Sequence, residues 1–228
     1  LSFKVSPGKS LAILGHTGSG KSTIANLICR LYDVHSGAIL VDGIPIQDLN
    51  LDSYRDQIGY VPQEVFLFSD SIENNIAFST ASEKINKERV EQAARDTEVY
   101  ENIAAFPEGF KTRVGERGIT LSGGQKQRIS IARALVKEPH LLIFDDCLSA
   151  VDTETEERIL NHLKRIMKDK TTIIISHRVS SVKHCDEIIV LEEGQILEKG
   201  SHSELLDKGG YYNEIHEQQQ LEIMNAED

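Results

Sequence analysis

Short apolar runs alternate with longer amphipathic stretches along the chain, and this pattern predicts a mixed α/β fold. The apolar runs have the length of strands, and they lie at 10–14, 58–61, 141–144, 171–175 and 187–191. Between the third and the fourth run, residues 153–168 form a charged amphipathic stretch with helical spacing. Two strands joined through a helix are typical of a parallel sheet, so we expect such a sheet at the centre of the molecule.

Shorter features add elements around this sheet. Residues 2–5 alternate like a strand, and 38–46 predict a β-hairpin because Asp42-Gly43 lies in the middle. A helix is expected at 21–31. A closing hairpin is expected where 195–199 follows the last apolar run.

Helical spacing replaces the strand pattern between 68 and 137. The clearest helices are predicted at 83–105 and 125–137, and Pro139 ends the second of them. We interpret this part as a helical satellite lobe. The final stretch, EQQQLEIMNAED, is polar and is expected to fray.

Composition narrows the classes of protein. The chain has 228 residues, enough for one core with a small satellite lobe, and its net charge of -11 disfavours a nucleic acid as partner. The three cysteines are scattered, which favours free thiols in a reducing compartment. No apolar run approaches the roughly 20 residues that a membrane span requires. The chain begins with Leu1 in place of Met, so we expect it to be part of a longer protein.

The segment GHTGSGKS at 15–22 fits the phosphate-binding pattern G-x-x-x-x-G-K-[ST], and it lies between a predicted strand and a predicted helix. Its glycines let successive N–H groups point toward one anion, and the helix adds the positive end of its dipole. Lys21 would reach the β- and γ-phosphates, and Ser22 would offer its hydroxyl to Mg²⁺. The alternative is a plain glycine-rich connector. The nucleotide-binding candidates are Gly15, His16, Thr17, Gly18, Ser19, Gly20, Lys21, Ser22 and Thr23.

Asp145 and Asp146 follow the apolar run LLIF, so they stand at the carboxyl end of a predicted strand, where open α/β sheets bind ligands. A carboxylate at the position of Asp145 can hold the Mg²⁺ that bridges nucleotide phosphates. A structural aspartate that caps the next turn is the alternative.

A second glycine motif, LSGGQKQR, begins at Leu121. Ser122 is the expected N-cap of a helix, and Gly123 and Gly124 expose backbone N–H groups beside Gln125. This second potential anion-binding site has no lysine at the position that Lys21 takes in GHTGSGKS. We therefore expect it to complete a nucleotide site on a second copy of the domain.

With GHTGSGKS, LSGGQ and LLIFDD in this order, the chain resembles the nucleotide-binding domain of an ATP-binding cassette (ABC) transporter over nearly its whole length. The resemblance implies a P-loop NTPase core with a mixed central sheet, an antiparallel β-subdomain and an α-helical signature subdomain. It implies a single domain over 1–228, with the core at about 1–67 and 138–228 and the helical subdomain at about 68–137. The membrane domain and the first strand, which carries the adenine-stacking residue, would precede Leu1.

The same resemblance implies roles for other residues. Gln63 in VPQE would contact Mg²⁺ and water and sense the transmembrane partner, and His177 would contact the γ-phosphate. The metal-binding set would be Ser22, Gln63 and Asp145. Communication across a head-to-tail dimer would use Ser149, Ala150, Val151 and Asp152. Taken singly, Gln63 could be a loop residue, and Asp152 and His177 could be helix caps.

Two segments resemble those of exporters. VGERG begins at Val114 and ends at Gly118, and FLFSDSIENNI follows Gln63. The resemblance implies contacts with transmembrane domains at the cytoplasmic face of the cell membrane. A charged surface loop that needs glycines for its turns is the alternative for VGERG.

Asp146 departs from the family pattern, which places Glu after the Mg²⁺-binding Asp to polarise the attacking water. Asp is shorter by one methylene, about 1.3 Å, and a misplacement of about 1 Å costs on the order of 100-fold in rate. We therefore expect ATP binding with slow hydrolysis at this chain's own site, as in the degenerate half of a heterodimeric exporter. A homodimeric exporter ATPase that tolerates Asp and a nucleotide-gated dimerisation module with little turnover remain open.

Overall fold

The computed structural model describes residues 1–79, 86–115, 119–147 and 153–226. The chain forms two compact units, one made of Leu1–Asp48 with Thr171–Asp228 and the other of Leu49–Lys170. Each unit combines parallel strands with helices, which confirms the predicted mixed α/β class.

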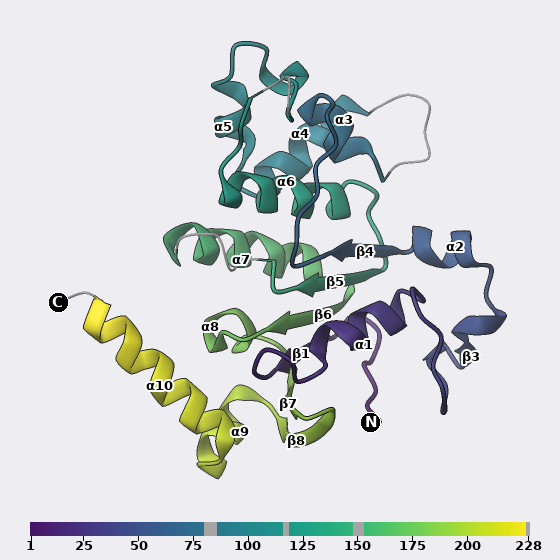
Figure 1. The fold of residues 1–228 in the computed structure, drawn as a ribbon, viewed down its shortest axis with the longest axis vertical. Helices are drawn as coiled ribbons and strands as arrows, with labels where there is room; N and C mark the ends of the chain where they lie inside the picture. The colour runs from purple at the N-terminus through teal and green to yellow at the C-terminus, as the bar shows by residue number, and fades with distance from the viewer. Residues whose placement is uncertain (80–85, 116–118, 148–152, 227–228) are drawn as a thin grey trace. The chain divides into compact units, whose positions relative to one another are not determined.

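The larger sheet of the first unit has the strand order β6 (Thr171–Ser176), β1 (Ser10–Leu14), β7 (Glu187–Glu192) and β8 (Gln195–Gly200) (Figure 1). β1 is parallel to both of its neighbours, and β8 is antiparallel to β7. The side chains of β1 and β6 are almost all buried, because such strands are covered on both faces. Exposed and half-buried residues alternate along β8, as expected of a strand with one solvent-exposed face.

The helices of the first unit are α1 (Lys21–Ile28), α8 (Val179–Val182), α9 (His202–Lys208) and α10 (Tyr211–Ala226). The predicted hairpin at 38–46 is present as β2 (Leu40–Val41) and β3 (Ile44–Pro45), followed by the 3-10 turn η1 (Ile46–Asp48). Asp42 and Gly43 have φ angles of 51° and 82°, and positive φ at both central residues is what a type I′ turn requires.

In the second unit, β4 (Ile58–Val61) pairs in parallel with β5 (Leu141–Asp145). The other elements are α2 (Leu51–Asp56), α3 (Ile72–Ala77), α4 (Lys87–Asp96), α5 (Tyr100–Ala104), η2 (Gly109–Lys111), α6 (Gly123–Leu135) and α7 (Thr153–Met167). Helices α3 to α6 enclose one apolar core, in which Ile76, Ile103 and Ile129 are fully buried.

Three predictions about these elements were wrong. Residues 2–5 have no regular secondary structure. The single helix predicted at 83–105 is two helices within the described residues, because α4 ends at Asp96 and α5 begins at Tyr100. The polar C-terminal stretch does not fray before Ala226, because α10 runs through it.

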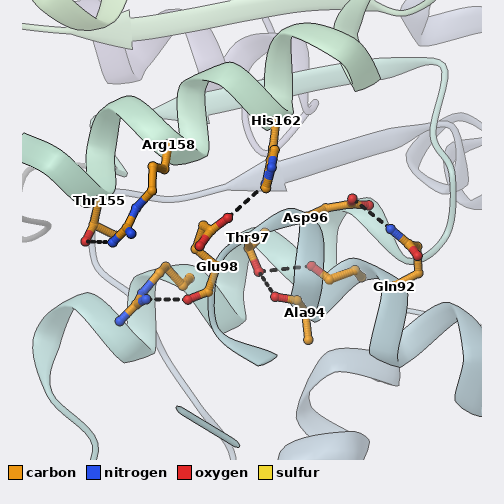
Figure 2. A network of polar contacts seen from close by, with 10 residues as sticks. Gln92, Ala94, Asp96, Thr97, Glu98, Thr155, Arg158 and His162 are labelled. Atoms are coloured by element: carbon orange, nitrogen blue, oxygen red, sulfur yellow. Dashed lines mark hydrogen bonds and ion pairs between the residues drawn. The ribbon is translucent and has the colours of Figure 1, made fainter. Parts of the chain in front are cut away.

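The break between α4 and α5 has a local cause, visible in Figure 2. The buried Thr97 hydroxyl donates to the carbonyl oxygens of Ala93 and Ala94 at 3.0 and 3.3 Å. Glu98 then takes a positive φ of 55°, and its carboxylate lies 3.2 Å from the His162 ring of α7. Side-chain bonds of this kind compete with the helical ladder and end the helix here.

The three cysteines, Cys29, Cys147 and Cys185, are buried, and none of them forms a disulfide. Burial raises the pKa of Cys185 to about 12. In the part of the chain that the structure describes, no helix has both the length and the apolar character needed to cross a membrane.

Candidate functional site

The loop between β1 and α1 takes a conformation that its glycines make accessible. A Cβ atom on Gly15 would lie 2.3 Å from the Leu191 carbonyl oxygen, so only glycine fits there without backbone movement. Gly18 and Gly20 have φ angles of 86° and 100°, which L side chains rarely adopt. The pattern G-x-x-x-x-G-K-[ST] therefore coincides with a loop that follows the sheet closely and turns sharply into a helix.

This loop concentrates positive potential at the start of α1. The Lys21 ammonium donates to the carbonyl oxygens of Gly15 and His16, both at 2.7 Å, so the side chain folds back over the loop. The N-cap of α1 is Gly20, which has no side chain to cap the first N–H groups, and the first turn contains no acidic residue. The backbone N–H groups at the start of a helix, beside an ammonium, suit a polyanion such as nucleotide phosphates.

The turn between β7 and β8 supports the loop from the side. The Gly194 N–H donates to the Ser19 carbonyl oxygen at 3.1 Å. Ser19 is buried, and its hydroxyl has no hydrogen-bond partner among the described residues. His16, Thr17 and Gly18 are exposed, so the loop presents its tip to solvent.

His177 follows β6 directly and is exposed. Leu14, the last residue of β1, is paired with Ser176 in parallel register. Because the carboxyl ends of parallel strands lie at one edge of a sheet, the phosphate loop and His177 leave the first unit's sheet at the same edge.

In the second unit, Gln63 and the two aspartates lie near the carboxyl ends of two neighbouring parallel strands, β4 and β5. Val61, at the end of β4, is paired with Phe144, which precedes Asp145. The Gln63 amide donates to the Asp146 carboxylate at 3.3 Å. Asp145 is only 3% exposed, and its carboxylate accepts from the Tyr60 hydroxyl at 3.4 Å.

Asp146 has a positive φ of 47°. Among residues other than glycine, Asp and Asn tolerate this left-handed conformation best. The sequence alone could not show this backbone feature, because nothing in LLIFDD distinguishes it from an extended strand end.

The signature segment begins α6 as predicted, with Ser122 at the N-cap. The Ser122 hydroxyl accepts from the Gln125 N–H at 3.2 Å, and the Gln125 side chain accepts from the Ser122 N–H at 2.9 Å. This capping box fixes the turn while Ser122 and Gly123 stay exposed. Leu121 is buried in the helical core, so an apolar anchor holds the exposed start of this helix.

Arg128, one turn further along α6, connects this segment to the α4–α5 break. Its guanidinium donates to the Gly124 carbonyl oxygen at 3.3 Å and to the Glu98 carbonyl oxygen at 2.5 Å. Since Glu98 also contacts His162 of α7 (Figure 2), the signature segment is held to the rest of the second unit by polar contacts as well as by Leu121.

The two segments that resemble exporter sequences lie side by side. The Val114 N–H donates to the Asp70 carbonyl oxygen at 2.9 Å, and the Ile72 N–H donates to the Thr112 carbonyl oxygen at 3.0 Å. A Cβ atom on Gly115 would lie 2.5 Å from the Ser69 hydroxyl. Residues 116–118 of VGERG lie outside the described residues, as do Ser149, Ala150, Val151 and Asp152.

Three aromatic rings beside these segments form an exposed cluster, made of Phe66, Phe68 and Phe78. Phe66 and Phe78 are 67% and 62% exposed, and both pack on Phe68, with ring centroids 5.1 and 4.2 Å away. The Arg133 guanidinium holds the backbone below them through the carbonyl oxygens of Phe66 and Asn75, at 2.9 and 2.7 Å. Burial lowers the pKa of Arg133.

One contact at this site was not predicted from the sequence. Gln219 of α10 hydrogen-bonds to the main chain on both sides of Arg178, next to His177. Gln219 lies in a run of three glutamines, so its residue type alone did not distinguish it. The available signal was its spacing, because Tyr212, Ile215 and Gln219 have the i, i+3, i+7 spacing of one helix face.

The chain is similar to proteins of one family. Residues 1–149 match the family model described as "ABC transporter". The chain is 49% identical over 221 residues to "ABC transporter B family member 6" of Dictyostelium discoideum, which covers 97% of this chain and 32% of that protein. It is 47% identical over 227 residues to an "ATP-dependent lipid A-core flippase" of Legionella pneumophila strain Paris, covering 100% of this chain and 38% of the relative.

A solved structure agrees with these relatives. "Structure of a bacterial Atm1-family ABC exporter with ATP bound" superposes with a TM-score of 0.91 at 44% identity, over 96% of this chain and 38% of that one. The chain thus spans about a third of the length of the proteins that it matches. With a family model that matches most of its length and a shared fold at this identity, the chain belongs to the ABC transporter family.

Proposed function

We propose that the chain is the ATP-binding and ATP-hydrolysing domain of an exporter, and that it powers the transport of a substrate across a membrane. The observation that carries this proposal is the phosphate loop, where the Lys21 ammonium lies over the glycine turn that leads into the start of α1. The names of the relatives, a flippase and an exporter with ATP bound, support the direction of transport. We place the domain at the cytoplasmic face of the membrane.

The residues present suit ATP with Mg²⁺. Hydroxyl, amide and carboxylate oxygens are the ligands that Mg²⁺ prefers, and Ser22, Gln63 and Asp145 would supply them. The bound metal would neutralise charge that develops on the phosphates. Lys21 and the loop N–H groups would hold the β- and γ-phosphates, and His177 would contact the γ-phosphate.

Asp146 would orient the attacking water, and two features support a slow site. Its carboxylate is shorter than that of Glu, and it is already engaged by Gln63 at 3.3 Å. We therefore propose that this chain acts as the weaker half of a pair. Its signature residues Leu121, Ser122, Gly123, Gly124 and Gln125 would complete the ATP site of a second, non-identical nucleotide-binding domain. Ser149, Ala150, Val151 and Asp152 would serve communication across that dimer.

The exposed aromatic cluster supports a transmembrane partner. Exposed aromatic rings that lie together mark protein interfaces more often than monomer surfaces. Phe66, Phe68 and Phe78 lie between Gln63 and the VGERG segment in the chain, and their neighbour Arg113 donates to the Ser69 carbonyl oxygen at 3.2 Å. We propose that this surface receives the transmembrane domains.

In domain terms, we propose one nucleotide-binding domain over 1–228. Its core with the β-subdomain would comprise about 1–67 and 138–228. The helical subdomain would comprise about 68–137, which includes α3 to α6 and the signature segment.

The test is ATP binding and hydrolysis by the wild type and by Lys21→Ala, with Lys4→Ala as a control that removes an exposed lysine outside the loop. Charged hydrogen bonds contribute roughly 1.5–3 kcal/mol, so we expect Lys21→Ala to weaken ATP binding by about 10- to 100-fold. Lys4→Ala should bind like the wild type. Equal binding by Lys21→Ala and the wild type would contradict the proposal.

A further inference from the structure

Gln219 of α10 binds the main chain beside His177 with both ends of its amide. Its Nε2 donates to the His177 carbonyl oxygen at 2.7 Å, and its Oε1 accepts from the Val179 N–H at 2.8 Å. A donor and an acceptor on one planar amide are thus matched to an acceptor and a donor two residues apart. This complementarity fixes the orientation of the amide and the separation of the two backbone groups.

The segment that Gln219 holds includes the start of the short helix α8. Val179 is the first residue of α8, and N–H groups in a first helical turn have no intrahelical acceptor. The N-cap residue, Arg178, makes no side-chain capping bond, whereas its N–H donates to the Ser176 hydroxyl at 3.0 Å. Gln219 therefore supplies the cap of α8 from a different helix.

The helix that carries Gln219 is itself well anchored. Tyr212 is fully buried, Ile215 is 7% exposed, and the Tyr212 hydroxyl lies 2.7 Å from Nδ1 of His202 in α9. Gln219 is half-buried, whereas its neighbours Gln218 and Gln220 are exposed. The amide therefore extends from a fixed support.

The same helix also contacts the phosphate loop. The Tyr211 ring lies edge-on to the His16 ring, with centroids 5.9 Å apart. Eight residues separate Tyr211 from Gln219, or about 12 Å along a helix axis. One helix thus contacts both loops that leave this edge of the first unit's sheet.

We propose that Gln219 is a positioning residue for His177. By fixing the carbonyl of His177 and the N–H of Val179, it restricts the backbone from which the imidazole projects, so that the ring meets the γ-phosphate at a constant position. The inference rests on the proposed function, in which His177 contacts that phosphate. A misplacement of about 1 Å costs on the order of 100-fold in rate, so the contact matters for the rate of hydrolysis more than for ATP binding.

The experiment compares Gln219→Ala with the matched control Gln218→Ala in the intact protein, with and without His177→Ala, and follows hydrolysis of the ATP bound at this chain's own phosphate loop. For Gln219→Ala we expect kcat for ATP hydrolysis to fall by about tenfold or more, while KM changes by less than about threefold. Gln218→Ala should match the wild type. In the His177→Ala background, Gln219→Ala should have no further effect, because it acts through the imidazole.

A second measurement does not depend on hydrolysis. Without nucleotide, the Val179 amide should exchange its hydrogen faster in Gln219→Ala than in the wild type or Gln218→Ala. If His177→Ala slows hydrolysis while Gln219→Ala leaves both kcat and the Val179 exchange rate unchanged, the inference is overturned and the proposed function stands. A full additional loss from Gln219→Ala in the His177→Ala background would also overturn it, since the role would then be structural. If His177→Ala hydrolyses ATP like the wild type, the proposed role of His177 fails, and the inference fails with it.

Discussion

Replacing Asp146 with Glu should make the site faster and the fold less stable. The Glu side chain has one more methylene group than Asp, so its carboxylate reaches about 1.3 Å further from the backbone. If the water is misplaced by about 1 Å in the wild type, Asp146→Glu should raise the rate of hydrolysis by on the order of 100-fold. That factor corresponds to about 2.7 kcal/mol in the activation free energy.

The backbone conformation at Asp146 determines how much stability the Asp146→Glu substitution costs. Its φ of 47° is left-handed, and the left-handed conformation costs L residues roughly 1–2 kcal/mol, with Asp and Asn among the exceptions. Glu loses that local advantage, so we expect a loss of about 1 kcal/mol in the free energy of unfolding. In a chain of this size, that loss lowers Tm by about 2–4 °C.

The assay is single-turnover release of phosphate from bound ATP, with Tm measured on the same samples. Asp146→Asn is the matched control, because Asn keeps the shape and the tolerance of positive φ but removes the carboxylate. It should keep the wild-type Tm and hydrolyse more slowly. If Asp146→Glu is no faster than the wild type while Asp146→Asn is slower, Asp146 already positions the water and the slow-site reasoning is wrong.

Two further predictions concern stability. Gly59→Ala should lower the free energy of unfolding by about 1–3 kcal/mol, because its Cβ would lie 2.8 Å from the Ala134 carbonyl oxygen and 2.7 Å from Cγ of Pro139; urea unfolding with an unchanged midpoint would contradict this. For Asp186, burial alone would raise the pKa, but Lys9 and the Ser10 N–H and hydroxyl outweigh it and lower the pKa to about 2. Because the folded pKa is lower than the usual 3.8, the carboxylate stabilises the fold above about pH 4, and this stabilisation is lost as pH falls from about 4 to about 2. The side chains of Lys9 and Asp186 are 59% and 42% exposed, so solvent limits the effect to roughly 1 kcal/mol. In urea titrations, Asp186→Asn should be less stable than the wild type at pH 7 and approach it at pH 3, and a constant difference would refute the assignment.

The sequence by itself determined the elements that depend on local chemistry. The apolar run at 10–14 is β1 with the same bounds, and Ser122 is the N-cap of α6, since a strand's burial and a cap's hydrogen bond are both encoded within a few residues. The hairpin at 38–46 follows in the same way from Asp42-Gly43. The glycine spacing of the phosphate loop was likewise sufficient to predict where the chain turns into α1.

Only the tertiary structure decided the features that join residues far apart in the chain. The close contact of Gly15 with Leu191 and the hydrogen bond between Gln63 and Asp146 depend on strand order, which no local pattern encodes. The conformation of Glu98 after the end of α4 is supported by His162 of α7, and the polar C-terminal stretch is helical because Tyr212 and Ile215 of the same helix are buried. In each case the free energy comes from a partner that is distant in sequence, so the fold had to be formed before the residue's role was defined.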